Sequence, residues 1–384
     1  MAQPTDDGTA AGSRPGHGGT GAALKVVICW TNISGYMAAC WRALAALPGI
    51  GLEVIAYADE QASSDTAFDG GLLAGMTNRL LAPGERDDGP LVERLVMERR
   101  PDVVLVCGWG FPAYRRLATV PALARVPFIM SMDTPWLGTL RQILTVPLKR
   151  RYVRRMAAVL VAGERAAEHA RRIGVAERRI HKGVYAYDER LFHDGLLEER
   201  LALPGGWPRR FLYVGRYVAS KGVDVLLAGY DAYRRSVPDP WSLTCCGRGA
   251  LGARMAAAPG VTDRGFVQPG DQPAVLREHG AFILPSRYEP WGVVLAEALA
   301  SGLPAICTTA CGAGVELLHP HSNGLLVPPD DPEALAAALR RIHDLGDRLP
   351  AMGRRAAAVA PGYAASVWAR RVEAICRELV PAVA

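Results

Sequence analysis

The stretch "AFILPSRYEPWGVVLAEALASG" (residues 281–302) contains a short apolar run, a polar loop and a second apolar run. The first run has the length of a buried strand and ends at Pro285. The second predicts a helix that begins near Gly292 and ends at Gly302. Parallel α/β sheets are built from such strand–loop–helix units, and they bind ligands at the carboxyl ends of their strands. The loop therefore predicts a ligand site.

Similar apolar runs alternate with helical segments through the rest of the chain. This alternation predicts parallel sheets covered by helices on both faces. A Pro- and Gly-rich stretch without periodicity, "LALPGGWPRR" (201–210), divides the runs into two sets. The sequence thus predicts two doubly wound α/β domains with a cleft between them, after a disordered tail of polar and small residues at 1–22. The predicted strands lie at 24–30, 52–58, 102–108, 127–133 and 157–163 in the first set, and between 211 and 328 in the second.

Composition narrows the class of protein. The 384 residues carry a net charge of +6, and no apolar run reaches the roughly 18 residues of a membrane-spanning helix. The N-terminal residues lack a basic start followed by an apolar stretch, so we expect no secretory signal and a cytoplasmic protein. Eight cysteines without a CxxC pair, and no histidine cluster, favour reduced thiols over a zinc site.

The segment "RQILTVPLKRRYVRR" (141–155) holds six basic residues and no acidic one. We predict a helix over 148–160 whose apolar residues share one face. Two interpretations stay open: a solvated basic surface, or peripheral association with an anionic membrane or anionic acceptor. Nucleic acid is not expected, because no recognisable binding module accompanies the patch. The shared apolar face comprises Leu148, Tyr152, Val153, Met156, Val159 and Leu160.

A second loop, within "FLYVGRYVASKGVDVLLAGY" (211–230), carries two cations between a predicted strand and helix. Arg216 and Lys221 are close enough in sequence to converge on one anion, and Gly215 permits close backbone approach. The pair suits a diphosphate. The alternative is two ordinary surface cations, although a cation at a helix N-terminus is unfavourable unless an anion joins it.

Two carboxylates flank the helix start in the opening stretch. Backbone N–H groups of Gly292, Val293 and Val294 would form an anion site there. Glu297 lies among apolar residues and needs a partner, which a ribose diol could supply. Glu289, at the loop tip, could accept hydrogen bonds from sugar hydroxyls. The alternatives are an arginine partner for Glu297 and simple solvation for Glu289.

Together these elements resemble the nucleotide-binding domain of retaining glycosyltransferases of the GT-B fold, specifically glycosyltransferase family 4. The resemblance runs from about residue 210 to 340. Its most specific signal is Glu289-x7-Glu297 with the upstream Arg216 and Lys221. It also rests on "YVGRYVASKG" (213–222), "CCGRG" (245–249), "RGFV" (264–267) and the segment around Glu316.

The resemblance implies a GT-B fold with two Rossmann-like domains facing a central cleft. The domain at 23–200 would bind the acceptor, the domain at 208–362 the nucleotide-sugar, and a helix within 363–384 would cross back to the first domain. Arg216 and Lys221 would neutralise the departing diphosphate, Glu297 would hold the ribose and Glu289 the donor sugar. The implied donor-binding set also includes Gly215, Gly247, Pro290, Trp291, Gly292, Val293 and Val294.

The implied reaction is retaining transfer of a hexosyl unit from a UDP- or GDP-sugar, without a metal or cofactor. The acceptor would be a saccharide, a lipid-linked saccharide or a small molecule, in bacterial polysaccharide or glycoconjugate biosynthesis. With a lipid-linked acceptor, the protein would work at the inner face of the membrane. A sugar-nucleotide-binding protein without transfer activity, and a sugar-nucleotide epimerase, are the alternatives.

The N-terminal half departs from the family pattern. Gly35 stands alone in "WTNISGY" (30–36), where many members have two adjacent glycines. "SMDTPW" (131–136) lacks the histidine that contacts the donor sugar in many members. Asp133 could take a hydrogen-bonding role toward sugar or acceptor, and Trp136 could stack on a sugar face. The alternative is that Asp133 caps a turn before Thr134-Pro135.

Overall fold

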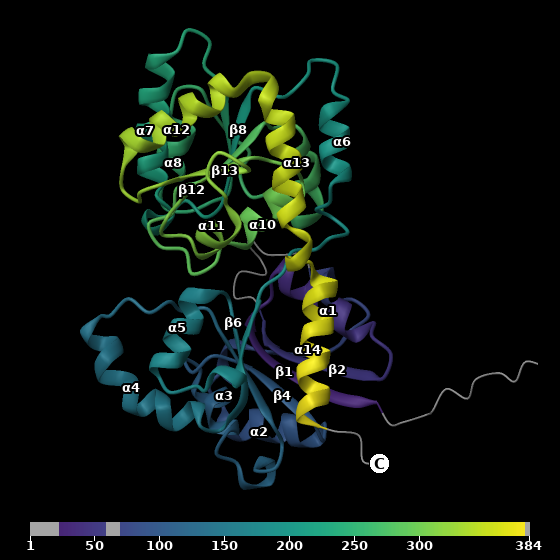
Figure 1. The fold of residues 1–384 in the computed structure, drawn as a ribbon. Helices are drawn as coiled ribbons and strands as arrows, with labels where there is room; N and C mark the ends of the chain where they lie inside the picture. Colours follow the sequence, from purple (N-terminus) through teal and green to yellow (C-terminus); the bar gives the residue numbers. More distant parts are fainter. Residues whose placement is uncertain (1–22, 59–69, 381–384) are drawn as a thin grey trace, which may run out of the picture.

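The computed structural model describes residues 23–58 and 70–380. They form two α/β domains, one above the other in Figure 1, with helix α14 lying along the N-terminal domain. The tail predicted at 1–22 lies outside the described residues. The predicted pair of doubly wound parallel sheets is confirmed, with the order of strands reversing once in each sheet.

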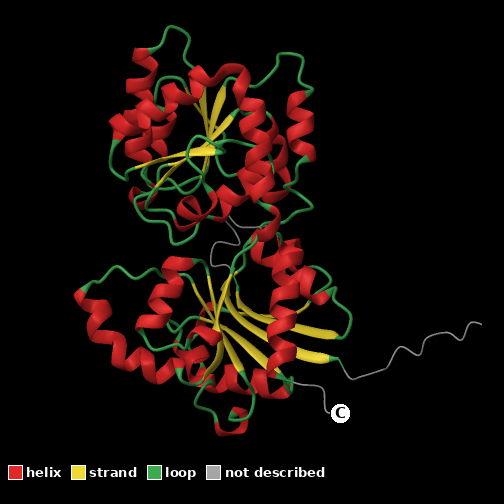
Figure 2. Ribbon diagram, viewed as in Figure 1, coloured by secondary structure: helices red, strands yellow, loops and turns green. Residues whose placement is uncertain are grey.

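The N-terminal sheet has seven parallel strands in the order β3-β2-β1-β4-β5-β6-β7. Its central strands are buried along most of their length, because helices cover both faces (Figure 2). The strand order reverses between β1 and β4, where doubly wound sheets open a crevice for ligands. The strands are β1 (Leu24–Asn32), β2 (Ile50–Tyr57), β3 (Thr77–Leu81), β4 (Val103–Cys107), β5 (Phe128–Met132), β6 (Met156–Val161) and β7 (Ile180–Lys182); the helices are α1 (Gly35–Ala45), α2 (Gly89–Glu98), α3 (Pro112–Leu117), α4 (Leu140–Val153) and α5 (Glu164–Arg172).

The C-terminal sheet has six parallel strands in the order β10-β9-β8-β11-β12-β13. Its order reverses between β8 and β11, so the loops that follow these two strands lie side by side. The strands are β8 (Arg210–Val214), β9 (Ser242–Cys246), β10 (Val261–Asp263), β11 (Ala281–Leu284), β12 (Ala305–Thr308) and β13 (Gly324–Val327); the helices are α6 (Gly195–Leu201), α7 (Val223–Ser236), α8 (Gly252–Ala256), α9 (Gln272–Arg277), α10 (Val293–Ala300), α11 (Gly312–Leu317), α12 (Pro332–Leu345) and α13 (Leu349–Val359).

Helix α6 packs with helices α9 and α13 of the C-terminal domain, although the expected N-terminal range of 23–200 includes most of it. The buried guanidinium of Arg200 donates hydrogen bonds to the backbone oxygens of Ser301 at 2.9 Å and Leu276 at 2.8 Å. Burial lowers the pKa of Arg200 to about 9. A buried guanidinium needs hydrogen-bond partners, and those of Arg200 belong to the C-terminal domain. The boundary between the domains therefore lies before α6.

Helix α14 (Ala365–Leu379) packs against α1 of the N-terminal domain (Figure 1). The indole nitrogen of Trp368 donates a 3.0 Å hydrogen bond to the backbone oxygen of Val184. The carboxylate of Glu189 accepts hydrogen bonds from the amides of Ala365 and Ser366, each at 3.0 Å. Glu189 thereby satisfies two amides of the helix N-terminus, which have no partner within the helix.

The helix predicted over 148–160 is wrong in its bounds. Helix α4 begins at Leu140 and ends at Val153. Met156, Val159 and Leu160 instead lie in β6, which pairs with β5 and β7 and is buried. Sheet pairing outweighs the helical periodicity of this apolar run. In the described part of the chain, no helix is long and apolar enough to span a membrane.

Candidate functional site

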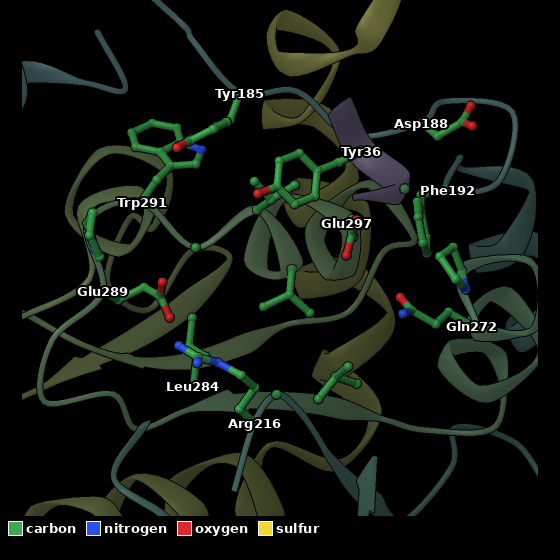
Figure 3. Close-up of a pocket in the computed structure, with 18 of the residues that line it drawn as sticks. Tyr36, Tyr185, Asp188, Phe192, Arg216, Gln272, Leu284, Glu289, Trp291 and Glu297 are labelled. Atoms are coloured by element: carbon green, nitrogen blue, oxygen red, sulfur yellow. The ribbon is translucent and has the colours of Figure 1, made fainter. Parts of the chain in front are cut away.

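A pocket of about 350 Å³ lies where the carboxyl ends of the two sheets face each other. The C-terminal domain contributes the loops after β8 and β11 and the start of α10. The N-terminal domain contributes the start of α1, the residue after β5 and parts of the segment 185–192. Figure 3 shows side chains from both domains pointing into this space. The predicted residues in its wall are Gly35, Asp133, Gly215, Arg216, Lys221, Glu289, Pro290, Trp291, Gly292, Val293, Val294 and Glu297.

Lys221 and Glu289 form an ion pair in the wall of this pocket. Their side chains are only 17% and 11% exposed, so the pair is shielded from solvent. The hydroxyl of Ser286 also donates to Glu289, at 3.3 Å. Gly222, which follows Lys221, has a φ of +65°, and a Cβ there would lie 2.0 Å from the carbonyl oxygen of Pro285. Glycine therefore lets the Lys221 loop pack directly onto the end of β11.

Arg216 faces the pocket from the end of β8 and is exposed. Its guanidinium makes no ion pair with any described residue. Figure 3 shows it across from Glu289, below the centre of the pocket. A guanidinium offers a planar pair of donors that matches phosphate oxygens. Arg216 is thus a positive group without an ion-pair partner among the described residues, in the same pocket wall as the partly shielded Lys221.

The N-terminus of α10 supplies a third positive feature. Gly292, the residue before the helix, has a φ of +100°, and a Cβ there would lie 2.9 Å from Cys311 Sγ. Val293 and Val294 begin the helix and line the pocket. Amides in a first helical turn have no preceding carbonyl to bond, and the helix dipole makes this end positive. The turn is a suitable anion site.

Glu297 lies one helical turn further along α10 and also lines the pocket. Burial raises the pKa of its carboxyl to about 8, with the nearby Asp188 carboxylate as a second cause. No described residue donates a hydrogen bond to this carboxyl group. Figure 3 shows it directed toward the interior of the pocket. The alternative of an arginine partner is not observed among the described residues, so a ligand is left as the natural partner.

Asp133 joins this pocket to a second one of about 690 Å³, lined mainly by N-terminal residues, since it lines both. Tyr36, Tyr185 and Arg216 also line both pockets. It follows β5, and its carboxylate accepts a 2.9 Å hydrogen bond from the hydroxyl of Tyr185. The ring of Tyr185 meets that of Tyr36 edge to face, with centroids 5.6 Å apart. The walls of the second pocket also include Trp30, Trp109 and Phe111.

Two predicted site residues line neither pocket. Trp136 packs beside His169, with ring centroids 5.3 Å apart, and the Arg172 guanidinium lies 5.2 Å from the centre of its ring. Gly247 lies against the loop after β8, where a Cβ would be 1.9 Å from the carbonyl oxygen of Gly215. Both residues therefore lie outside the walls of the two pockets, and their predicted contacts with the sugar and the nucleotide stay predictions.

Gly35 does line the pocket, and a Cβ there would lie 2.8 Å from Pro269 Cγ of the opposite domain. Other lining residues went unrecognised in the sequence. Four of them, Tyr185, Asp188, Leu191 and Phe192, lie in "GVYAYDERLF" (183–192), the crossing between domains, where no periodicity separates pocket from core residues. The unrecognised residues labelled in Figure 3 are Tyr36, Tyr185, Asp188, Phe192, Gln272 and Leu284.

Within the described residues, no group of three or more His, Cys, Asp or Glu side chains could hold a metal ion. All eight cysteines are buried free thiols. Burial raises the pKa of Cys246 to about 11 and that of Cys107 to about 12, so these thiols are poor nucleophiles. The wall of the pocket between the domains carries the cations Arg216 and Lys221 and the carboxylates Asp133, Asp188, Glu289 and Glu297.

Two Rossmann-like domains with a pocket between their facing edges are the arrangement of the GT-B class of fold. The family comparisons agree. A model of the group 1 glycosyl transferases matches residues 208–344, and a model of the glycosyl transferase 4-like domain matches residues 33–182. Together they cover both domains, and the chain belongs to the group 1 glycosyltransferases.

Curated relatives carry related names. The chain is 29% identical over 259 residues to an alpha-D-kanosaminyltransferase of Streptomyces kanamyceticus, spanning 63% of this chain and 66% of that protein. It is 34% identical over 160 residues to a D-inositol 3-phosphate glycosyltransferase of Salinispora tropica, spanning 38% and 32% respectively. These matches cover less than two thirds of the relatives' lengths.

Solved structures share the fold. Anabaena HepE in complex with UDP superposes with a TM-score of 0.70 at 16% identity, covering 92% of this chain and all of that one. A glycosyltransferase from Rickettsia africae has a TM-score of 0.72 at 14% identity, covering 94% and 99%. At these identities the likeness shows the GT-B fold alone.

Proposed function

We propose that the protein transfers a hexosyl unit from a nucleoside-diphosphate sugar to a hydroxyl acceptor. The observation that carries this proposal is the pocket between the domains. There Arg216, Lys221 and the start of α10 offer positive charge, while Glu289 and Glu297 offer hydrogen-bond acceptors. A diphosphate needs the first set, and the hydroxyl-bearing sugar and ribose need the second.

The donor is proposed to be a UDP-sugar, with GDP-sugars as the alternative. UDP and UDP-glucose complexes are named for the structural neighbour HepE, which supports a uridine donor. In the proposed pose, the diphosphate lies against Arg216 and the amides of Val293 and Val294. The two ribose hydroxyls donate hydrogen bonds to the Glu297 carboxylate, to which no described residue donates.

The proposed transfer retains configuration at the anomeric carbon. The bond from that carbon to the phosphate oxygen breaks, and the acceptor oxygen bonds on the same face of the sugar. The acceptor proton passes to the departing phosphate oxygen, so no protein base is required. Arg216, Lys221 and the α10 dipole stabilise the charge that builds on the diphosphate. We propose that this stabilisation makes the reaction independent of a metal ion, to be checked by activity that persists in EDTA.

The second pocket is the proposed acceptor site. Its aromatic walls suit the apolar face of a sugar ring, and it opens into the donor pocket at Asp133. The acceptor would be a saccharide, lipid-linked or free, or a small molecule. Asp133, held by the Tyr185 hydroxyl, would orient the attacking hydroxyl.

Asp133→Asn should lower kcat/KM for the acceptor by about 10- to 100-fold, since it weakens one charged hydrogen bond worth roughly 1.5–3 kcal/mol. Binding of UDP should change little, because the proposed uridine and diphosphate contacts lie elsewhere. Tyr185→Phe is the matched variant that frees Asp133 without removing its charge. Steady-state kinetics of the wild type and the variants test this prediction. Unchanged turnover and affinity in Asp133→Ala would contradict the proposed role of Asp133 toward the acceptor.

The experiment that tests the whole proposal has two stages. First, UDP, GDP, ADP and their sugar conjugates are compared by thermal shift on the wild type and on Arg216→Ala. A ligand that binds the native state raises its melting temperature by mass action. Second, release of free nucleoside diphosphate is followed with and without candidate acceptors.

A shift with one base, reduced in Arg216→Ala, and release that requires an acceptor are the expected results. Binding without any release would favour the non-catalytic alternative. Conversion of the donor sugar to its epimer without an acceptor would favour the epimerase. Either result would overturn the proposed transfer.

A further inference from the structure

Helix α4 carries an unusual apolar surface. Eight large hydrophobic side chains are classed as exposed in the described part of the chain, and five of them lie between residues 137 and 148. The five are also the most exposed of the eight, at 51–71%, against 40% or less for the others. They are Leu137, Leu140, Ile143, Leu144 and Leu148.

The spacing of these residues gives them a common side. Leu140, Leu144 and Leu148 follow one another at intervals of four residues, which places them on one face of the helix. Ile143, three residues after Leu140, lies on the same face, so the four side chains form one stripe along the helix. Val146 and the buried Val153, on the other side of α4, hold the helix to the domain. Tyr152, which continues the row of leucines, is partly buried, so the exposed stripe ends at Leu148. The stripe therefore faces away from the core. Figure 1 shows α4 at the outer edge of the N-terminal domain, on the side opposite α14.

Free positive charge surrounds the stripe. No acidic residue occurs between Thr134 and Gly163. Two of the basic residues in this segment are engaged internally: Arg155 bonds backbone oxygens, and Lys149 lies 4.6 Å from the centre of the Trp109 ring. The other four are exposed and make no ion pair with any described residue: Arg141, Arg150, Arg151 and Arg154.

We infer that this α4 surface, residues 137–154, docks on an anionic lipid bilayer. Leucine and isoleucine side chains that enter the acyl boundary, flanked by arginines that reach acidic headgroups, are the chemistry of an interfacial helix. Two copies of this chain would fit the surface less well. A two-fold contact places each patch against itself, and the segment has no carboxylate to offset arginine facing arginine.

The position of the surface relates it to the site. Thr134 to Thr139 link Asp133 directly to the start of α4. Lys149 of α4 also contacts Trp109, which lines the proposed acceptor pocket. Docking through α4 would hold that pocket near the bilayer, where an acceptor anchored in lipid is found. The inference concerns membrane binding itself and does not require the proposed transfer reaction.

The test uses the full chain and vesicles, in the absence of any nucleotide. Co-sedimentation is measured with phosphatidylcholine vesicles and with vesicles containing about one third phosphatidylglycerol. We expect binding to the anionic vesicles at least tenfold tighter than to the neutral ones, and weakened by high salt. Arg150→Gln with Arg151→Gln and Arg154→Gln should weaken binding about fivefold for each residue that approaches the surface.

The decisive variant combines Leu140→Ser, Leu144→Ser and Leu148→Ser, which keeps every charge. Its affinity for anionic vesicles should fall at least tenfold, because the variant has no leucine side chains at these positions to enter the bilayer. Met97→Ser with Arg94→Gln, on the exposed side of α2, is the matched control and should bind like wild type. Circular dichroism and the melting temperature show that each variant is folded.

Equal binding by the triple-serine variant and the wild type, or no binding to anionic vesicles at all, would overturn the inference. A wild-type dimer at micromolar concentration that the triple-serine variant abolishes would overturn it too, and would assign the stripe to self-association. Donor binding and turnover are assayed separately in solution. Failure of the proposed function is thereby distinguished from failure of the membrane inference.

Discussion

Replacing Glu297 by glutamine is expected to stabilise the free protein at alkaline pH while weakening its binding to a nucleotide-sugar. Burial raises the pKa of this carboxyl from 4.5 to about 8, so ionising it in the empty pocket costs free energy. Each unit of such a shift corresponds to about 1.4 kcal/mol. Because Glu297 is partly open to the pocket, we expect a gain of about 1–3 kcal/mol at pH 8.5.

The pH dependence has a definite sign. A folded-state pKa above the unfolded one means that the stabilising effect of the proton is complete below about pH 4.5 and is lost as the pH rises through about 8. The difference between Glu297→Gln and wild type should thus be small at pH 5 and largest above pH 8. Melting temperatures measured across this range test the claim, with the exposed Glu333→Gln on α12 as control.

The same substitution should raise the Kd of the nucleotide-sugar about 10- to 100-fold at pH 8, because hydrogen bonds to a charged acceptor contribute roughly 1.5–3 kcal/mol. A variant that is more stable but binds the nucleotide-sugar poorly would show that the Glu297 carboxylate lowers the stability of the free protein and serves ligand binding. A variant that is less stable than wild type at pH 8.5, or that keeps full affinity, would contradict this interpretation.

The second large effect is expected from Lys221 and Glu289, which should behave as one unit. Lys221→Ala removes a cation from the proposed diphosphate site and leaves Glu289 shielded without its partner. We expect kcat/KM to fall about 10²- to 10³-fold, the typical result of removing one group that stabilises transition-state charge. The free energy of unfolding should fall by about 1–3 kcal/mol, the penalty for a buried group left unpaired.

A double-mutant cycle separates the pair from its parts. Lys221→Ala with Glu289→Ala should be more stable than Lys221→Ala alone, since no unpaired carboxylate remains. Lys182→Ala is the matched control, because Lys182 pairs with Glu164 in the open, with both side chains about half exposed. It should cost less than about 1 kcal/mol. Strictly additive effects of the Lys221 and Glu289 substitutions would show that the pair is not coupled.

Several features of the site could be predicted from local sequence because local chemistry dictates them. The strand–loop–helix pattern of 281–302 predicts a ligand loop at the carboxyl end of β11, and the structure places that loop in the pocket wall. Gly222 and Gly292 adopt positive φ beside close backbone or side-chain neighbours, where other residues would be strained. The placement of Arg216, Lys221 and Glu289 in the pocket wall could be predicted because all three lie in these two loops.

Other features depend on contacts between distant segments. The local sequence of the apolar run at 156–161 is compatible with either a helix or a strand. The run forms strand β6 because it pairs with β5 and β7. Trp136 is near Asp133 in sequence, yet packing against His169 keeps it out of the pocket. Tyr185 becomes a site residue only because the chain crosses between domains beside β5.

The sequence by itself determined the two doubly wound domains, the two loops that line the pocket and the pair of glutamates, since periodicity and loop residues are local properties. The tertiary structure alone decided that Lys221 pairs with Glu289, that no described residue donates a hydrogen bond to Glu297, and that α4 exposes its leucines. Each of these depends on which surfaces meet across the fold, because burial and pairing are set by neighbours far away in the chain.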